Sequence, residues 1–149
     1  MKLAKLSFAV LSLSLLACGG LSFVNAYISQ TTFLKDGSGT TVTVIPASGS
    51  PAGTVEYHIL LNPLASVDEG SLFMNIVRDD NVTMNPAPIQ LTSGVSSGEF
   101  TASYNLPNNN TTNVRTYTIK VTGRNDAGDS LGFAEDRGTF TQAAGAAQQ

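Results

Sequence analysis

The sequence has one cysteine, one histidine and no tryptophan among its 149 residues. Because Cys18 has no second cysteine to pair with, no disulfide can form within the chain, and the fold must depend on its hydrophobic core. His58 is the only histidine, which excludes a metal site built from several histidines. Basic residues are also scarce, with 8 against 11 acidic residues, and this balance argues against a nucleic-acid-binding surface.

Residues 1–26 have the organisation of a secretory signal peptide. Lys2 and Lys5 precede an apolar run over residues 6–17, which is too short to span a bilayer comfortably. The Val-Asn-Ala sequence that ends at Ala26 matches the residues that signal peptidase reads, so we expect the exported chain to begin at Tyr27. This interpretation predicts a periplasmic, cell-surface or secreted protein.

A second interpretation of the same segment is a lipid anchor. Residues 15–18, Leu-Leu-Ala-Cys, resemble the lipobox of bacterial lipoproteins, in which Cys18 would be lipidated and become the first residue. Leu16 lies where that pattern usually has a smaller or β-branched residue, and residues 21–24 are apolar rather than a polar tether. We therefore prefer cleavage after Ala26, and Cys18 is the only membrane attachment that the sequence offers.

The chain after Ala26 has the size and charge of one soluble domain. Removing Lys2 and Lys5 from the 8 basic residues leaves 6 against 11 acidic ones, a net charge of −5. We expect the domain to cover residues 27–141, which is long enough to bury a core without disulfides. Residues 142–149 are rich in Ala, Gly and Gln and predict a disordered tail.

The clearest strand pattern lies at residues 116–122. Tyr117, Ile119 and Val121 alternate with polar residues, which is the period of a strand half buried in an antiparallel sheet. A turn-forming segment follows at residues 124–129. Similar patterns predict further strands at residues 27–35, 40–45, 54–61, 71–78, 82–84, 89–92, 98–106 and 131–141.

The number and spacing of these strands predict the fold class. From these nine segments we expect seven or eight short strands. Their frequent turns, and the lack of a convincing helix beyond the signal peptide, favour an all-β domain made of a single antiparallel β-sandwich with Greek-key links. Residues 64–70 form a connection with room for one helical turn. A closed barrel is the alternative, and the uneven loop lengths favour the sandwich.

Residues 117–123, Tyr-Thr-Ile-Lys-Val-Thr-Gly, and the turn Asn-Asp-Ala-Gly at 125–128 resemble the last hairpin of bacterial immunoglobulin-like domains, including the PKD and fibronectin-like groups. The resemblance implies an immunoglobulin-like sandwich in which the Tyr117 ring is buried and its hydroxyl bonds the backbone. It also implies a binding, spacer or assembly role. The chain lacks the cysteine pair of antibody domains and the Trp-Asp-Phe-Gly-Asp stretch of PKD domains, so no subfamily is assigned.

Two patterns point towards catalysis, and each has a simpler interpretation. Residues 94–98, Gly-Val-Ser-Ser-Gly, match the string of a nucleophile elbow centred on Ser96, but that motif needs a preceding strand and a following helix. Here a strand follows, which favours an ordinary Gly/Ser turn. His58 is the only available base, and the alternation around it predicts a solvated strand position.

Calcium is the only metal that the sequence suggests. Asp79 with Asp80, and Asp126 with Asp129, lie in expected loops where oxygen ligands for calcium are common. No stretch has the spacing of a helical calcium loop, so solvated turn residues are the default interpretation. Two further acidic pairs are Asp68 with Glu69 and Glu135 with Asp136.

These observations assign no catalytic or cofactor-binding residues. The leading hypothesis is an exported, non-enzymatic immunoglobulin-like module that binds a protein or carbohydrate partner, or serves a structural role in the cell envelope. The first alternative is a subunit of a surface fibre that self-assembles by strand exchange through residues 27–35 or the C-terminal tail. The second alternative is a small secreted hydrolase.

Overall fold

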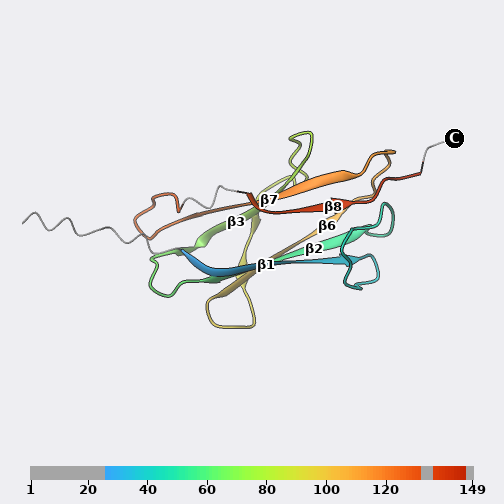
Figure 1. Ribbon diagram of the computed structural model, residues 1–149. Coiled ribbons are helices and arrows are strands. Elements are labelled where there is room, and N and C mark those ends of the chain that lie inside the picture. The colour runs from blue at the N-terminus through green and yellow to red at the C-terminus, as the bar shows by residue number, and fades with distance from the viewer. Residues whose placement is uncertain (1–25, 132–135, 147–149) are drawn as a thin grey trace, which may run out of the picture.

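The computed structural model describes residues 26–131 and 136–146, with the side chains of 136 and 137 excluded, and these residues form eight strands (Figure 1). Residues 1–25, which include Cys18 and all of the expected signal peptide except Ala26, lie outside the described residues, as does Glu135. The strands are β1 (Tyr27–Asp36), β2 (Gly53–Leu61), β3 (Asp68–Arg78), β4 (Ile89–Gln90), β5 (Thr92–Ser93), β6 (Glu99–Leu106), β7 (Arg115–Arg124) and β8 (Asp136–Gln142).

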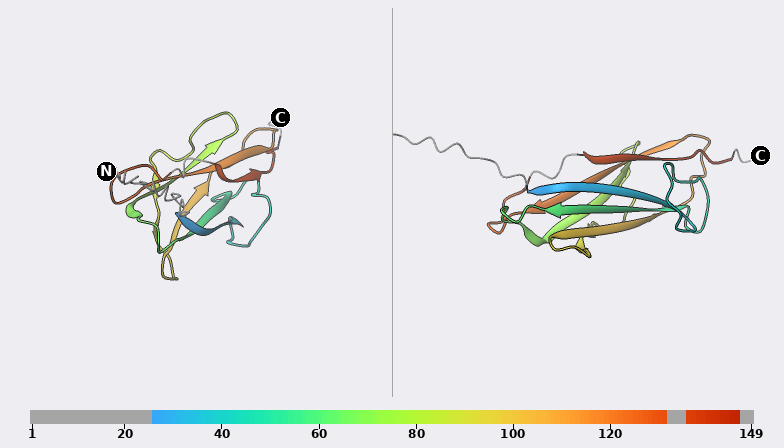
Figure 2. Two further views of the ribbon diagram at one scale, coloured as in Figure 1. Left: turned by 60° about the vertical axis from the view of Figure 1, so that its left-hand side comes forward. Right: turned by 60° about the horizontal axis from the view of Figure 1, so that its bottom comes forward.

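The strands form two antiparallel sheets that pack against each other (Figure 2). Sheet A has the order β1-β2-β6-β5, and sheet B has the order β4-β3-β7-β8. The chain passes from one sheet to the other between β2 and β3, between β4 and β5, and between β6 and β7, which gives Greek-key links. The predicted all-β sandwich is therefore confirmed.

The core lies between the sheets and follows the predicted alternation. In β7, Tyr117, Ile119 and Val121 are buried, and β7 lies between β3 and β8 in sheet B. In β2, Val55, Tyr57 and Ile59 are fully buried on the opposite sheet. Burying one such side chain stabilises the fold by about 1.5–3 kcal/mol, so these two strands make a large contribution to stability.

Residues 40–45 do not form the predicted strand. A turn at residues 36–39 folds this segment back beside the end of β1, where Lys35 bridges Thr41, and Ile45 then forms an isolated parallel bridge with Gln142 at the end of β8. Within the segment Val44 is 44% exposed, whereas its neighbour Ile45 is fully buried. The segment therefore connects the edges of the two sheets.

The predicted strand at residues 89–92 is divided between the two sheets. Ile89–Gln90 pairs with β3 in sheet B, and Thr92–Ser93 pairs with β6 in sheet A. Leu91 lies between these segments, is buried, and donates its backbone N–H to the carbonyl of Leu72. The apolar Leu91 thus enters the core at the point where the chain changes sheets.

Three further segments differ from the sequence-based expectation. Residues 64–70 contain a turn closed by Ala65 and Asn62, with no helical turn, and β3 already begins at Asp68. Residues 82–84 make only a bridge to β3, because the side chain of Asn85 accepts the N–H of Ile76 in place of a backbone partner. β8 covers residues 136–142 and so ends one residue beyond the expected 141, whereas residues 132–135 of the expected strand lie outside the described residues. Among the described residues, none forms a helix long and apolar enough to cross a membrane.

Candidate functional site

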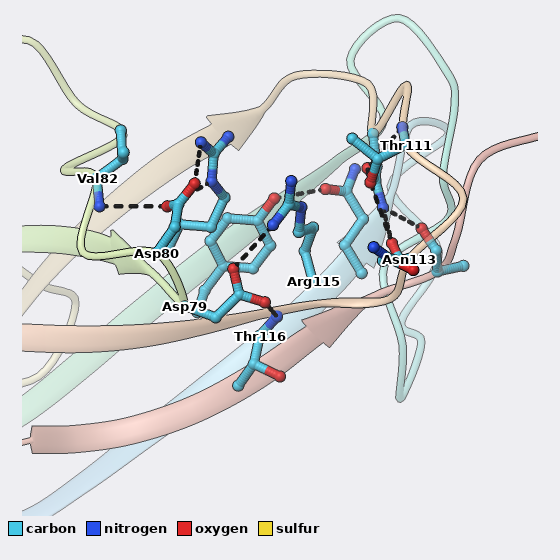
Figure 3. Close-up of polar contacts among 12 residues, drawn as sticks. Asp79, Asp80, Val82, Thr111, Asn113, Arg115 and Thr116 are labelled. Carbon is cyan, nitrogen blue, oxygen red and sulfur yellow. Dashed lines mark hydrogen bonds and ion pairs between the residues drawn. The ribbon is translucent and has the colours of Figure 1, made fainter.

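One end of the sandwich, where β3 ends and β7 begins, carries a network of arginine and aspartate side chains (Figure 3). Arg78 donates two hydrogen bonds to Asp80, at 2.9 and 2.7 Å. Asp79 accepts bonds from the Arg115 side chain and from the N–H of Thr116, both at 3.2 Å. The Arg78 guanidinium lowers the pKa of Asp80 to about 2. Both aspartates are therefore engaged in contacts that hold the β3–β4 turn.

A buried polar chain lies directly beside this network. The Tyr117 hydroxyl donates to Oε1 of Gln142 at 2.7 Å, and Nε2 of Gln142 donates to the carbonyls of Pro46 and Pro107 at 3.1 and 2.9 Å. Burial of Tyr117 raises the pKa of its hydroxyl. The ring is buried as the resemblance implied, but the hydroxyl bonds a side chain instead of the backbone. Sequence reasoning did not identify this role of Gln142.

The loop after β6 is held at the same end by the buried side chain of Asn109. Its Nδ2 donates to the carbonyls of Asn113 and Ala143, both at 2.8 Å, and its Oδ1 accepts from the N–H and hydroxyl of Thr111. The N–H of Gly145 also bonds the carbonyl of Thr111. Residues 142–145, which follow the expected domain end at 141, therefore bond with this loop.

The outer face of sheet A carries His58 and Glu99, with Nδ1 of His58 at 2.9 Å from Oε1 of Glu99. The rings of His58 and Phe33 also pack at nearly right angles to each other, with centroids 5.1 Å apart. His58 and the N–H of Ser96 lower the pKa of Glu99. His58 is half-buried, so the prediction of a simple solvated position is only partly correct.

Ser96 lies in the exposed turn between β5 and β6. Its N–H donates to Oε2 of Glu99 at 3.1 Å, its carbonyl accepts the N–H of Glu99, and Gly98 adopts a positive φ of 76° that closes the turn. Strand β6 follows the serine, where a nucleophile elbow requires a helix. The hydrogen bonds of the described residues join His58 to Glu99 and not to the Ser96 hydroxyl.

The two pairs of calcium candidates lie at opposite ends of the sandwich. Asp79 and Asp80 follow β3, whereas Asp126 and Asp129 lie in the turn after β7. Asp126 accepts a bond from Ser66, and Asp129 accepts one from Asn125. Within the described ranges, no group of three or more His, Cys, Asp or Glu side chains is placed to hold a metal ion.

The same outer face of sheet A presents rows of short polar side chains. Thr31, His58, Thr101 and Thr92 lie opposite one another across the four strands. A shallow depression of about 450 Å³ is lined by six polar residues, Glu56, His58, Gln90, Thr92, Thr101 and Ser103, and by the apolar residues Ile89 and Ala102. Lys35 pairs with Glu56 at 2.7 Å, which leaves this surface rich in hydroxyls and with its charges paired. Such a surface can form hydrogen bonds to a ligand.

We found no match to this chain among protein-family models, curated proteins or solved structures.

Proposed function

We propose that the chain is an exported immunoglobulin-like module that binds a protein or carbohydrate partner and performs no catalysis. The strand order supports this proposal. The order β1-β2-β6-β5 against β4-β3-β7-β8 corresponds to the A-B-E-D and C′-C-F-G sheets of immunoglobulin-like sandwiches. Tyr117 lies near the start of the seventh strand, where such domains carry a buried tyrosine.

The roles of the polar residues favour a module without catalysis. The groups that a hydrolase or a metal site would need are used to shape turns and to connect strands. Glu99 bonds His58 and caps the Ser96 turn, and the arginines bind the aspartates after β3. A catalytic base and nucleophile would instead be expected within hydrogen-bond reach of each other.

The outer face of sheet A is the surface that we propose for the partner. Its central position is Thr101, which is half-exposed and lines the depression beside His58 and Ser103. Hydroxyl and imidazole groups can donate and accept hydrogen bonds, so they suit a polar partner such as a glycan or an extended peptide.

Photo-crosslinking on intact producing cells tests this surface. A photoreactive amino acid is introduced at Thr101 in sheet A or, as a matched control, at Thr122 on the outer face of sheet B. We expect a discrete adduct from position 101 and none from position 122. Equal adducts from both positions, or none from either, would contradict the proposed surface.

Export is tested separately by mass spectrometry of the N-terminus of the protein isolated from cells and medium. The proposal predicts a chain that begins at Tyr27. A lipid-modified Cys18 as the first residue would show an anchored protein, and an unprocessed Met1 would contradict export.

A further inference from the structure

The four edge strands of the sandwich differ in how they are protected from pairing with another chain. β4 and β5 have two residues each, and Pro86 and Pro88 directly precede β4. β8 contains Asp136 and Arg137 in its sequence, and Ile45 bridges its far end. Short length, proline, charge and covering segments are the usual protections of a sheet edge. β1 has ten residues and few of these features.

The backbone of β1 has hydrogen-bonding groups that point away from β2, towards its outer edge. The carbonyl of Leu34 accepts the N–H of Val42 at 2.8 Å, and this bond points away from β2. Because bonding direction alternates along an antiparallel strand, the N–H and C=O groups of Gln30 and Thr32 point the same way. In the described part of the chain, no strand pairs with this side of β1 before Leu34.

The side chains of β1 allow a close approach of two copies. Residues 27–34 carry no charged group. The rest of the chain is acidic, because removal of Lys2 and Lys5 from the 8 basic residues leaves 6 against 11 acidic ones, a net charge of −5. Thr31 and Phe33 are exposed, and the first charge, Lys35, is paired with Glu56. Two such edges can therefore meet without opposing like charges.

We propose that β1 pairs antiparallel with β1 of a second copy, about a two-fold axis that passes between the two Thr31 residues. This register places Gln30 of one copy opposite Thr32 of the other, so their outward N–H and C=O groups bond each other. It also places Phe33 opposite Ser29. The two A sheets then form one continuous sheet, and each β1 keeps its own pairing with β2.

The second copy is the favoured occupant because the pattern is self-complementary about Thr31. The pairing differs from strand exchange. In strand exchange, β1 of one copy would pair with β2 of the other copy, whereas here the Thr31 residues of the two copies face each other. A single strand pair buries less surface than a standard interface, so we expect a dissociation constant on the order of tens of micromolar. This inference does not depend on the proposed partner surface around Thr101.

Sedimentation velocity over a hundredfold range of concentration tests the pairing, with protein expressed from the full chain. We expect the wild type to form dimers, and Thr31→Lys or Thr31→Glu alone to weaken dimerisation by about a hundredfold, because like charges then face each other. A mixture of the two variants should dimerise again, since lysine and glutamate then lie opposite each other.

The matched control is Thr92→Lys, which adds the same charge in the same row of sheet A but on the opposite edge. It should dimerise as the wild type does, and circular dichroism should show that all variants are folded. A wild type that stays monomeric at millimolar concentration overturns the proposal. Thr31 variants that still dimerise, or a mixture that stays monomeric, overturn it as well.

Discussion

The two ends of the sandwich are built in different ways. At the end where β3 stops and β7 begins, Gln142 and Asn109 are buried and bond the surrounding loops. At the opposite end, apolar side chains face solvent, with Leu64 82% exposed and Ile28 60% exposed. A depression of about 530 Å³ there is lined by Ile28, Leu60, Leu61, Asn62, Pro63, Ala65, Val67, Glu69, Ser97 and Gly98.

This difference indicates at which end a substitution should cost more stability. A buried amide that loses its partner leaves several polar groups without water or protein to bond, and each such group costs about 1–3 kcal/mol. An exposed leucine that is replaced loses little, because it buries little surface in the folded state. The loops of the polar end should therefore contribute more to stability than the loops of the opposite end, and four predictions test this comparison.

The largest effect is expected at the polar end for Tyr117→Ala, which removes a buried ring stacked 5.1 Å from Phe140. We expect a loss of about 2–5 kcal/mol in the free energy of unfolding, measured by urea denaturation. Ile59→Ala in sheet A should lose a similar amount. Tyr117→Phe keeps the ring and separates the contribution of the hydroxyl, and a Tyr117→Ala variant as stable as the wild type would contradict the assigned core.

The next effect is expected for Gln142→Ala, a change in a residue first interpreted as part of a tail. It removes the partners of the Tyr117 hydroxyl and of the Pro46 and Pro107 carbonyls, so we expect a loss of about 2–3 kcal/mol. The control is Gln148→Ala, outside the described residues. Equal melting temperatures for the two variants would show that Gln142 does not hold this end.

A pH titration of stability should reveal the Arg78–Asp80 pair. The pKa of Asp80 is lowered from 3.8 to about 2 in the folded state. A carboxyl with a lowered pKa stabilises the fold above its unfolded pKa, and this stabilisation is lost as the pH falls through the folded value. Thermal melts between pH 5 and pH 2 should therefore fall more steeply for the wild type than for Asp80→Asn. If the melting temperatures of the wild type and of Asp80→Asn fell in parallel with pH, the Arg78–Asp80 pair would not contribute to stability.

The smallest effect is expected at the apolar end. Leu64→Ser and Val95→Ser change side chains that are 82% and 103% exposed, so each should alter stability by no more than about 0.5 kcal/mol. His58→Ala, on the outer face of sheet A, should lose under about 1 kcal/mol, since its pair with Glu99 is partly exposed. A loss of several kcal/mol at Leu64 would mean that this end is packed after all.

The strands could be predicted from the sequence because alternation is a local property. Tyr117, Ile119 and Val121 show their buried face within six residues, and the structure buries all three. Leu91 looks like part of one strand because nothing in its neighbours reveals that the chain changes sheets there.

The roles of Gln142 and Asn109 could not be predicted in this way. Their partners are backbone carbonyls that only the completed topology brings together, and Gln142 lies in a stretch with the composition of a flexible tail. The local context of Ser96 and His58 favoured a turn and a strand position, and the structure places strand β6 after Ser96 and His58 within β2. Both residues contact Glu99. The contact between His58 and Glu99 joins positions 41 residues apart, and it could be predicted only with the register between β2 and β6 known.

The position of Gln142 in the chain has a consequence for the timing of folding. Its amide joins two carbonyls that precede it by 96 and 35 residues. Because a protein is made from its N-terminus, both carbonyls emerge from the ribosome or translocation channel well before their common donor. The hydrogen bonds of Gln142 at the polar end therefore cannot form until β8 has been synthesised and has emerged. A chain cut short before Gln142 would retain most of its apolar core and still lack this final closure.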